Sequence, residues 1–372
     1  MTVLKARQQQ LLAPLERIVG IVERRHTLPI LAHVMLRRTG STLELTTSDL
    51  DLQLRADVAL DDDGEAFAAT VGARKLADIL HAMPADQRIT LTAGANRLTL
   101  QGGRSRYVLQ TMPVGDFPLV RQAADLGSGF SVPQRVLKGL IDQVAFAMAA
   151  HDIRYFLNGM LFVVEGRQLT VVATDGNRLA LASASVPSEL APCQLILPRK
   201  TAHELQHLLR DDDAVGDAPV DMRFAAAQAM FCFGGIEFVS KLIEGRFPDY
   251  KRVIPREHTR RVTIARAALL DGLRRASIMT SDKFRGVRVE LAAGVLRIAA
   301  SNAEREESHE EIEADCTGES LAIGFNVGYL IDVLDRTATD TVVLDLTDAG
   351  SGALFSFPGR DEFRYVVSPM RL

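Results

Sequence analysis

Apolar residues along this 372-residue chain recur at two spacings: three or four residues apart in some segments, and two apart in others. The first spacing places apolar side chains on one face of a helix, and the second places them on one face of a strand. In the segment 72–83, for example, Leu76, Ile79, Leu80 and Met83 share one helical face. The same spacing predicts amphipathic helices over 8–26, 72–83, 132–148, 197–210, 263–279 and 325–337.

A strand–turn–strand pattern occurs three times. In the segment 171–181, VVATDGNRLAL, an apolar run meets Asp175-Gly176 and a second apolar run comes after it. Glycine adopts the turn conformation that other residues resist, so this pattern predicts a tight turn between two strands. Similar strands end at Asp49 and at Asn302, which lie 126 residues before and 127 residues after Asp175. Because both separations are about a third of the chain, we expect one structural unit to be repeated three times.

The order of predicted elements is the same in each third: helix, strands, helix, strands. The pattern predicts an α+β protein made of three tandem domains, each with two helices packed on antiparallel sheets. The period is much longer than that of solenoid repeats, so each copy is a whole domain. The predicted domains are 1–125, 128–253 and 255–372, with linkers at 121–129 and 252–260. Asn326 is a candidate N-cap for the last helix.

Composition narrows the class of protein. A hydrophobic content of 47% and a charged content of 24% are typical of a globular protein, and no run of about 18 apolar residues could span a membrane. The N-terminal segment lacks the pattern of a signal peptide, so we expect a cytoplasmic protein. Cys193, Cys232 and Cys316 lie far apart with no CxxC pair, which predicts buried free thiols in a reducing compartment.

Common catalytic motifs are missing from the sequence. It contains no phosphate-binding loop GxxxxGK[ST], no GxGxxG after a strand and no GxSxG. His203 and His207 do form an HExxH pattern, HELQH, which in zinc hydrolases holds the metal. Lys200 and Arg210 share that helical face, and a dication between two cations is disfavoured. The next glutamate, Glu237, is too distant to serve as the usual third ligand, so we expect no metal site and keep the zinc hydrolase as an alternative.

Charge is distributed unevenly along the chain. The formal net charge of −4 is unlike that of most nucleic-acid-binding domains, but the charges can be segregated onto separate faces. Basic residues gather on equivalent helices of the three copies, and acidic runs lie at 61–63, 211–213 and 304–313. A single basic cluster is typical of a solvated surface. Their recurrence on equivalent helices favours a surface that follows a sugar–phosphate backbone without reading its sequence.

Several long strings resemble those of the β sliding clamps, the processivity subunits of bacterial DNA polymerase III. The resemblance extends over the whole chain, in register. It depends on ERRHTLPIL at 23–31, ARK at 73–75, GRSR at 103–106, YFLNGMLF at 155–162, ATDGNRLA at 173–180, SKLIEGRFPDYKRVIP at 240–255, KFRG at 283–286, GFNVGYLIDVL at 324–334 and YVVSPMRL at 365–372.

The resemblance implies a ring of two subunits joined head to tail, with helices lining a hole that holds duplex DNA. Retention on DNA is then topological, so weak contacts independent of sequence suffice. The implied DNA contacts are Arg25, Arg74, His151, Arg154, Tyr155, Phe156, Arg199 and Lys200. The implied subunit contacts are Arg104, Arg106 and Tyr107 on one side, and Ile278, Met279, Glu304, Glu306 and Glu307 on the other.

The resemblance also implies a pocket that binds short peptides of the polymerase III catalytic subunit, the clamp loader, other polymerases and repair proteins. A few aliphatic anchors in a preformed pocket suit partners that exchange. An alternative is that these residues are merely core residues near the chain end. The implied walls are Leu157, Thr174, Gly176, Asn177, Arg178, Leu179, Pro248, Arg252, Val253, Val366, Val367, Ser368, Pro369, Met370, Arg371 and Leu372.

The predicted function is therefore that of a DNA sliding clamp: a homodimeric ring that tethers the replicative polymerase and other partners for processive DNA synthesis. Such a protein has no catalytic residues, metal or cofactor of its own, and a separate loader uses ATP. Asn177 and Ser368 stand where relatives often have histidine and methionine, and Phe156 lacks the hydroxyl of the usual tyrosine. These departures keep open a clamp-like paralogue with a specialised role.

Overall fold

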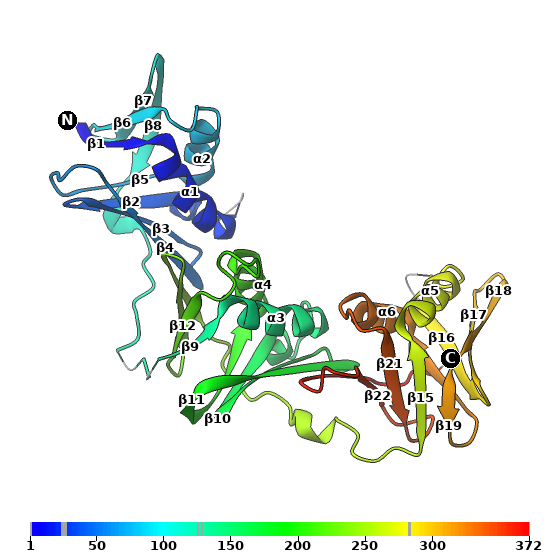
Figure 1. Ribbon diagram of the computed structural model, residues 1–372. Coiled ribbons are helices and arrows are strands. Elements are labelled where there is room, and N and C mark those ends of the chain that lie inside the picture. Colours follow the sequence, from blue (N-terminus) through cyan, green and yellow to red (C-terminus); the bar gives the residue numbers. More distant parts are fainter. Residues whose placement is uncertain (1, 24–27, 125, 128, 282–283, 372) are drawn as a thin grey trace. The chain divides into compact units, whose positions relative to one another are not determined.

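The structure is a computed structural model that describes residues 2–23, 28–124, 126–127, 129–281 and 284–371 (Figure 1). Its contacts divide the chain into two compact units. Unit 1 comprises Met1–Arg135 and His207–Leu242, and unit 2 comprises Val136–Gln206 and Ile243–Leu372. Within the described ranges, no helix is long and apolar enough to cross a membrane.

The first third of the chain contains helices α1 (Gln8–Ile18) and α2 (Ala73–His81). Its strands are β1 (Thr2–Arg7), β2 (His33–Thr39), β3 (Thr42–Ser48), β4 (Leu52–Ala59), β5 (Phe67–Gly72), β6 (Arg88–Ala93), β7 (Arg97–Gly102) and β8 (Ser105–Met112). The helix predicted over 8–26 is shorter than expected, because a 3-10 turn, η1 (Val19–Ile21), comes after Ile18. Gly20 lies in this turn, and glycine is a poor helix former.

The middle third contains helices α3 (Gln134–Val144) and α4 (Arg199–Leu208). Its strands are β9 (Phe130–Pro133), β10 (Gly159–Thr174), β11 (Arg178–Pro198), β12 (Pro219–Phe224), β13 (Gln228–Phe233) and β14 (Ile236–Lys241). Its 3-10 turns are η4 (Ala145–Ala147), η5 (Tyr155–Leu157) and η6 (Tyr250–Arg252). The other 3-10 turns, η2 (Pro29–Ala32) and η3 (Val114–Asp116), belong to the first third.

The last third contains helices α5 (Arg266–Ser277) and α6 (Val327–Asp335). Its strands are β15 (Arg260–Ala265), β16 (Gly286–Ala292), β17 (Val295–Ser301), β18 (Glu307–Glu313), β19 (Asp315–Thr317), β20 (Leu321–Asn326), β21 (Thr341–Leu346), β22 (Ala353–Ser356) and β23 (Phe363–Val367). The predicted cap of α6 is confirmed, because the Asn326 side chain accepts a hydrogen bond from the Gly328 backbone at 2.9 Å.

Strand pairing confirms the threefold repeat. In the first third the strands pair in the orders β1-β6-β7-β8 and β5-β2-β3-β4, and in the last third they pair as β15-β21-β22-β23 and β20-β16-β17-β18. The middle third has the matching order β9-β12-β13-β14. There the two long strands β10 and β11 replace four, because they pair at Gly159↔Pro198 and again at Thr174↔Leu179.

Each third is joined to the next by the edges of its sheets. In unit 1, β4 of the first third pairs with β14 of the middle third. In unit 2, β11 of the middle third pairs with β23 of the last. Because each junction is a pair of hydrogen-bonded strands, each outer third forms one compact unit together with part of the middle third. The boundaries 1–125, 128–253 and 255–372 stay a prediction from the repeat.

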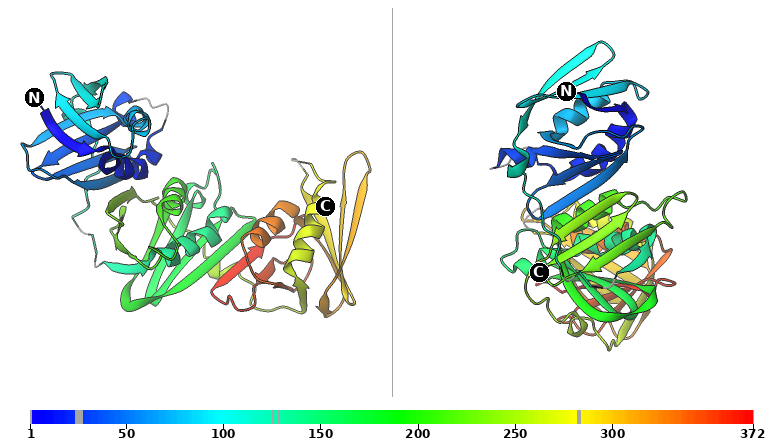
Figure 2. Two further views of the ribbon diagram at one scale, coloured as in Figure 1. Left: turned by 45° about the horizontal axis from the view of Figure 1, so that its top comes forward. Right: turned by 90° about the vertical axis from the view of Figure 1, so that its left-hand side faces the viewer.

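Several strands have a free edge within the described part of the chain, and two of these edges bear on the function. The β7–β8 hairpin of unit 1, cyan in Figure 2, is paired on its far side only at Thr111 and Met112. In unit 2, β18 pairs only with β17, and this yellow-to-orange hairpin runs along one side of its unit in the left view of Figure 2. Unpaired edges expose backbone N–H and C=O groups that can pair with another chain.

The helices bury the faces that their spacing predicts. Leu15 and Ile18 of α1 and Leu80 of α2 are buried in unit 1, as are Leu273 of α5 and Leu334 of α6 in unit 2. The cysteine prediction is corrected in one respect. Cys193, Cys232 and Cys316 are free, as expected, but they are only partly buried.

Candidate functional site

A tight turn in unit 2 connects β10 to β11, and we call residues Thr174–Arg178 the β11 turn. The carboxylate Oδ1 of Asp175 accepts hydrogen bonds from the backbone N–H groups of Asn177 at 2.9 Å and Arg178 at 3.0 Å. The hydroxyl of Thr174 accepts from the Gly176 backbone at 3.1 Å. Gly176 has a φ of +92°, a conformation that favours glycine. The side chains of Asp175 and Thr174 therefore hold the turn in one shape.

The guanidinium of Arg178 connects this turn to the last third of the chain. It pairs with Asp175 at 3.1 Å and with Asp332 of α6 at 2.5 Å, and it donates to the Phe146 carbonyl at 2.6 Å. It also lies 4.5 Å from the centre of the Tyr329 ring. Burial by itself lowers the pKa of Arg178, but the neighbouring Tyr365, Asp332 and Asp175 outweigh it and raise the pKa. Arg178 is thus a permanent cation that positions the turn.

A second arginine lies above the turn. Arg154 donates from Nε and Nη2 to the carboxylate of Asp152 at 3.0 and 2.8 Å, and from Nη2 to the Asp175 carbonyl at 3.3 Å. The bonds to Asp152 lower the pKa of that carboxyl to about 2. Asn158 holds the base of the loop by bonding to the backbone of Asp152 in both directions, at 2.8 and 2.9 Å.

A cavity of about 250 Å³ opens beside the turn, and we call it the β11 pocket. Leu157, Leu179 and Val366 provide buried apolar walls, and Val253 is 46% exposed at the rim. Its lining comprises Arg154, Phe156, Leu157, Thr174, Gly176, Arg178, Leu179, Phe247, Pro248, Tyr250, Val253, Val366 and Ser368. An apolar cavity with a few polar groups at its edge suits aliphatic or aromatic side chains of a ligand.

The structure brings together most of the residues that the resemblance assigns to the pocket. Leu157, Thr174, Gly176, Arg178, Leu179, Pro248, Val253, Val366 and Ser368 all belong to the lining. Four further lining residues were not among them: Arg154, Phe156, Phe247 and Tyr250. The sequence held a signal for one of these, because Phe247-Pro248 repeats the earlier Phe117-Pro118.

The other assigned residues lie beside the lining. Val367 is fully buried on the opposite face of β23 from Val366, because neighbouring strand residues point to opposite faces. Arg252 is exposed and pairs with Asp249 at 3.0 Å. Asn177, Pro369, Met370 and Arg371 are likewise outside the lining, and Leu372 lies outside the described residues.

The C-terminal segment is held against the turn by its backbone. The Ser368 N–H donates to the Asn177 carbonyl at 2.8 Å, and the Met370 N–H donates to the Gly324 carbonyl at 2.8 Å. The Met370 side chain is exposed, at 37%. The first of these bonds holds Ser368, which lines the pocket, beside the β11 turn.

Two of the arginines assigned to DNA lie at helix starts and, like Arg154, bond to backbone carbonyls. Arg74, at the start of α2, donates to the Val22 carbonyl at 3.0 and 2.5 Å. Arg199, at the start of α4, donates to the Met148 carbonyl at 2.8 Å. Each guanidinium thus holds the segment that comes after the first helix of its own copy. The recurrence of basic residues on equivalent helices therefore reflects, in part, bonds that hold the fold together.

The other residues assigned to DNA lie mainly on an exposed loop of unit 2. His151 is exposed and has a φ of +60°, and Tyr155 is 57% exposed with its ring 5.8 Å from that of Phe156. Lys200 is exposed in the first turn of α4. Phe156 instead lines the β11 pocket, and Arg25 lies outside the described residues.

The residues assigned to the subunit contact lie on the β7–β8 hairpin, at the end of α5 and at or just before the start of β18. Arg104, Arg106 and Tyr107 are exposed on the β7–β8 hairpin of unit 1. In unit 2, Ile278 is 73% exposed at the end of α5, and Met279 is the next residue. Glu304, Glu306 and Glu307 are exposed at the start of β18.

The HELQH pattern lies on α4. His203 and His207 are both exposed, and His203 contacts Gln206 at 3.3 Å. Among the described residues, no group of three or more histidine, cysteine, aspartate or glutamate side chains could hold a metal ion. The third ligand that a zinc hydrolase needs is thus missing from the surroundings of this helix in that part of the chain.

Comparison with known proteins gives consistent matches over the whole chain. Models of the DNA polymerase III beta subunit match in sequence order: the N-terminal domain over residues 2–121, the central domain over 131–249 and the C-terminal domain over 251–371. The beta sliding clamp of Pseudomonas putida is 43% identical over 369 residues, which are 98% of each chain. That of Escherichia coli K12 is 38% identical over 365 residues, again 98% of each chain.

Solved structures agree with these matches. A crystal structure of the sliding clamp of Pseudomonas aeruginosa superposes with a TM-score of 0.95 at 41% sequence identity, covering 100% of both chains. A second structure from the same organism, in which the clamp is bound to griselimycin, has a TM-score of 0.94 at the same identity and coverage.

Proposed function

This chain belongs to the β sliding clamps, the β subunits of bacterial DNA polymerase III, and we propose that it closes into a head-to-tail homodimeric ring around duplex DNA and binds partner peptides in the β11 pocket. It is a DNA sliding clamp, a processivity subunit without catalysis of its own. Its place of action is the cytoplasm, where it serves the polymerase III catalytic subunit, the clamp loader, other polymerases and repair proteins.

One observation carries the ring: the junctions between neighbouring thirds. The strand that leaves each turn, β4 or β11, pairs with the last strand of the next third, β14 or β23. By the same rule, β18 of the last third needs a partner equivalent to β14 and β23. The equivalent strand of the first third is β8, whose edge is unpaired along most of its length in the described chain. A second copy of the chain supplies it, so two chains close a ring.

The junctions also predict a register for the subunit contact. Gln53, Leu179 and Glu307 are equivalent, because each closes the pairing next to its turn. Gln53 and Leu179 each lie opposite the fourth residue of the strand they meet, in β14 and β23. The fourth residue of β8 is Val108. Glu307 of one protomer therefore faces Val108 of the other.

Charge supports the same register. If the pairing of Glu307 with Val108 is extended along the antiparallel strands, Arg104 lies opposite Glu311. Arg106 then lies diagonally across from both Glu307 and Glu311. Opposite charges at such positions each contribute roughly 0.2–1 kcal/mol. The exposed Ile278 and Tyr107 are the apolar part of the same contact.

A disulfide cross-link tests the ring. In a chain whose native cysteines are replaced by serine, Val108→Cys together with Glu307→Cys should give a covalent dimer under mild oxidation. The matched control moves one cysteine by a single residue, to Ser308, which points to the other face of its strand. Efficient cross-linking of the control, or none in the Val108 and Glu307 pair, would refute the proposed register.

The DNA contacts of this ring are weak and independent of sequence. His151, Arg154 and Tyr155 are exposed on one loop, and Lys200 lies on the first turn of α4. We expect Lys200→Gln to weaken binding to all duplex sequences alike and to lower the slope of binding against salt by about 1. Arg74→Gln and Arg199→Gln should instead reduce stability, since those guanidinium groups hold backbone carbonyls. Arg25 is part of the same proposal.

The β11 pocket is the proposed site for partner peptides, and griselimycin is a convenient probe of it, given the complex of the Pseudomonas aeruginosa clamp. Val253→Glu places a charge at the rim and should weaken griselimycin binding at least tenfold by calorimetry. Val215→Glu is the matched control, because Val215 is also a partly exposed valine, at 39%, but belongs to unit 1. Equal binding by both variants would place the ligand elsewhere.

A further inference from the structure

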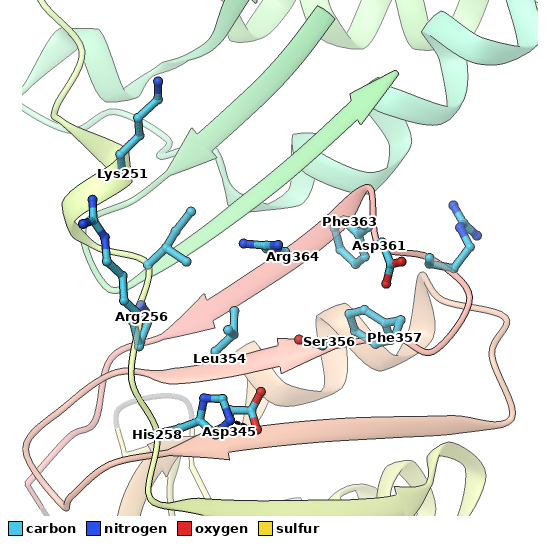
Figure 3. Close-up of a pocket in the computed structure, with 13 residues that line it drawn as sticks. Lys251, Arg256, His258, Asp345, Leu354, Ser356, Phe357, Asp361, Phe363 and Arg364 are labelled. Atoms are coloured by element: carbon cyan, nitrogen blue, oxygen red, sulfur yellow. Dashed lines mark ion pairs between the residues drawn. The ribbon is translucent and has the colours of Figure 1, made fainter. Parts of the chain in front are cut away.

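A second and larger hollow lies in unit 2, with a volume of about 770 Å³. Four cationic side chains line it: Lys251, Arg256, Arg360 and Arg364. Figure 3 shows that Lys251 and Arg256 come from the segment on one side of the hollow and that Arg364 comes from β23. We call it the cationic hollow. Its cations outnumber its two carboxylates in a chain whose net charge is −4.

One of the four cations, Arg360, is paired with Glu362 at 2.5 Å, and the two carboxylates of the hollow do not neutralise the other three. Asp345 is nearly buried, and it pairs with Arg261 at 2.7 Å and with His258 at 3.5 Å. The other carboxylate, Asp361, is exposed in the turn before β23 (Figure 3). Among the described residues, no carboxylate forms an ion pair with Lys251, Arg256 or Arg364.

The floor of the hollow is apolar. Leu354 and Ile254 line it, while the stacked rings of Phe357 and Phe363, with centres 5.1 Å apart, are almost fully buried at its wall. Leu354 and Ile254 also pack in the same cluster as Leu157 and Leu179 of the β11 pocket. The floor of one site is therefore continuous with the wall of the other.

A third hollow, of about 240 Å³, adjoins both sites. It shares Phe247, Pro248 and Tyr250 with the β11 pocket and Lys251 with the cationic hollow. The three hollows thus share one segment, 246–258, as part of their lining. This arrangement suits an extended chain rather than a compact ligand.

We propose that the cationic hollow binds an acidic peptide segment of the partner that occupies the β11 pocket. The cations come from both sides of an apolar floor, so carboxylates can pair with the cations while aliphatic side chains of the same peptide face the floor. A nucleic-acid backbone would supply the anions but has no apolar group for the floor. This inference rests on the proposed function of the β11 pocket, and it adds a requirement for acidic residues in the partner.

The direct test measures binding of a fluorescein-labelled octapeptide of alternating glutamate and leucine to the full-length protein by anisotropy. We expect at least tenfold tighter binding than that of the matched peptide of alternating glutamine and leucine. The double variant Arg256→Gln with Arg364→Gln should weaken binding of the acidic peptide at least tenfold. The control, Arg88→Gln with Arg288→Gln, removes the same charge from exposed strand positions and should stay within twofold.

Two further arms separate the alternatives. Saturating griselimycin should leave the acidic peptide bound, and displacement would show that the peptide occupies the β11 pocket instead. Equal binding of the two peptides, or equal loss in the two double variants, would overturn the proposal. The second arm measures binding of a twelve-nucleotide single-stranded DNA. The proposal would also be overturned if the Arg256 and Arg364 double variant bound this DNA tenfold more weakly but bound the acidic peptide as before. Griselimycin binding by the variants reports the β11 pocket separately, so the two proposals fail independently.

Discussion

The turn between β3 and β4 in the first third, Ser48–Leu52, is a close copy of the β11 turn. Asp49 accepts hydrogen bonds from the Asp51 and Leu52 backbones at 3.0 and 2.6 Å, just as Asp175 does two and three residues on. The Ser48 hydroxyl accepts from the Leu50 backbone at 3.3 Å, where Thr174 accepts from Gly176. Both turns have a positive φ at the same position, +82° for Leu50 and +92° for Gly176.

The two turns share a backbone geometry but differ in the residue at their end. Leu52, which is 1% exposed, ends the first turn with an apolar side chain in the core. Its counterpart is Arg178, which pairs with Asp332 of the next third. The same turn therefore ends in a core residue in the first third and in a residue that lines a pocket in the middle third. A repeated turn provides the backbone, and the residue at its end decides whether a site forms.

The largest effect should come from exchanging that end residue. Arg178→Met leaves Asp175 and Asp332 without their cation, which should lower the free energy of unfolding by about 3 kcal/mol. It should also weaken griselimycin binding at least tenfold. Urea unfolding and calorimetry measure the two quantities.

Leu52→Ala is the matched change in the first third. It leaves a cavity and should lower the free energy of unfolding by about 3 kcal/mol as well, but griselimycin binding should be unchanged. A similar loss of binding in both variants would mean that the turns are not distinguished by Arg178.

A smaller effect is expected at the position with positive φ. Gly176→Ala should destabilise by about 1–2 kcal/mol, because the new Cβ would lie 2.9 Å from the Arg154 guanidinium and the backbone favours glycine. Leu50→Gly should do the opposite and stabilise by about 0.5–1 kcal/mol, since it relieves the same backbone in the first turn. Thermal unfolding of the two variants should therefore shift in opposite directions, and shifts of the same sign would contradict the equivalence.

The smallest effect concerns the ion pair between Asp152 and Arg154, which lies beside the β11 turn. The folded-state pKa of Asp152 is lowered to about 2, so its pairing with Arg154 is complete above the ordinary pKa of 3.8 and is lost as pH falls through about 2. In Arg154→Gln the midpoint should return toward 3.8. Carbon NMR of the Asp152 carboxyl measures it, and an unchanged midpoint would show that Arg154 is not the cause. Between about pH 5 and 8 stability should not respond to this pair.

Much of the fold was predictable because its signals are local. The six amphipathic segments all became helices, although α1 ended early at Ile18, and Asn326 caps α6 as expected. The threefold repeat was predictable from the spacing of Asp49, Asp175 and Asn302. The lining of the pocket was predicted less completely, because Phe247 and Tyr250 reach it from a segment with no regular period.

The arginines show the limit of local patterns. Arg74 and Arg199 recur on equivalent helices, which favoured contact with DNA, but each donates to a carbonyl more than 50 residues away in sequence. A side chain with several donors can bond to whatever the fold brings near, so its use cannot be read from its position on a helix. The cationic hollow had no sequence signal for the same reason, since Arg256 and Arg364 are 108 residues apart.

By itself, the sequence determined the helices, the turns and the number of copies, because spacing, turn residues and caps act over a few residues. Only the tertiary structure decided which strand edges are paired, which arginines hold the backbone and where cavities open. Those outcomes depend on the register between strands that are distant in the chain. The pairing of β4 with β14 and of β11 with β23, and the unpaired edges of β8 and β18 within the described ranges, could be known only once the strands were placed.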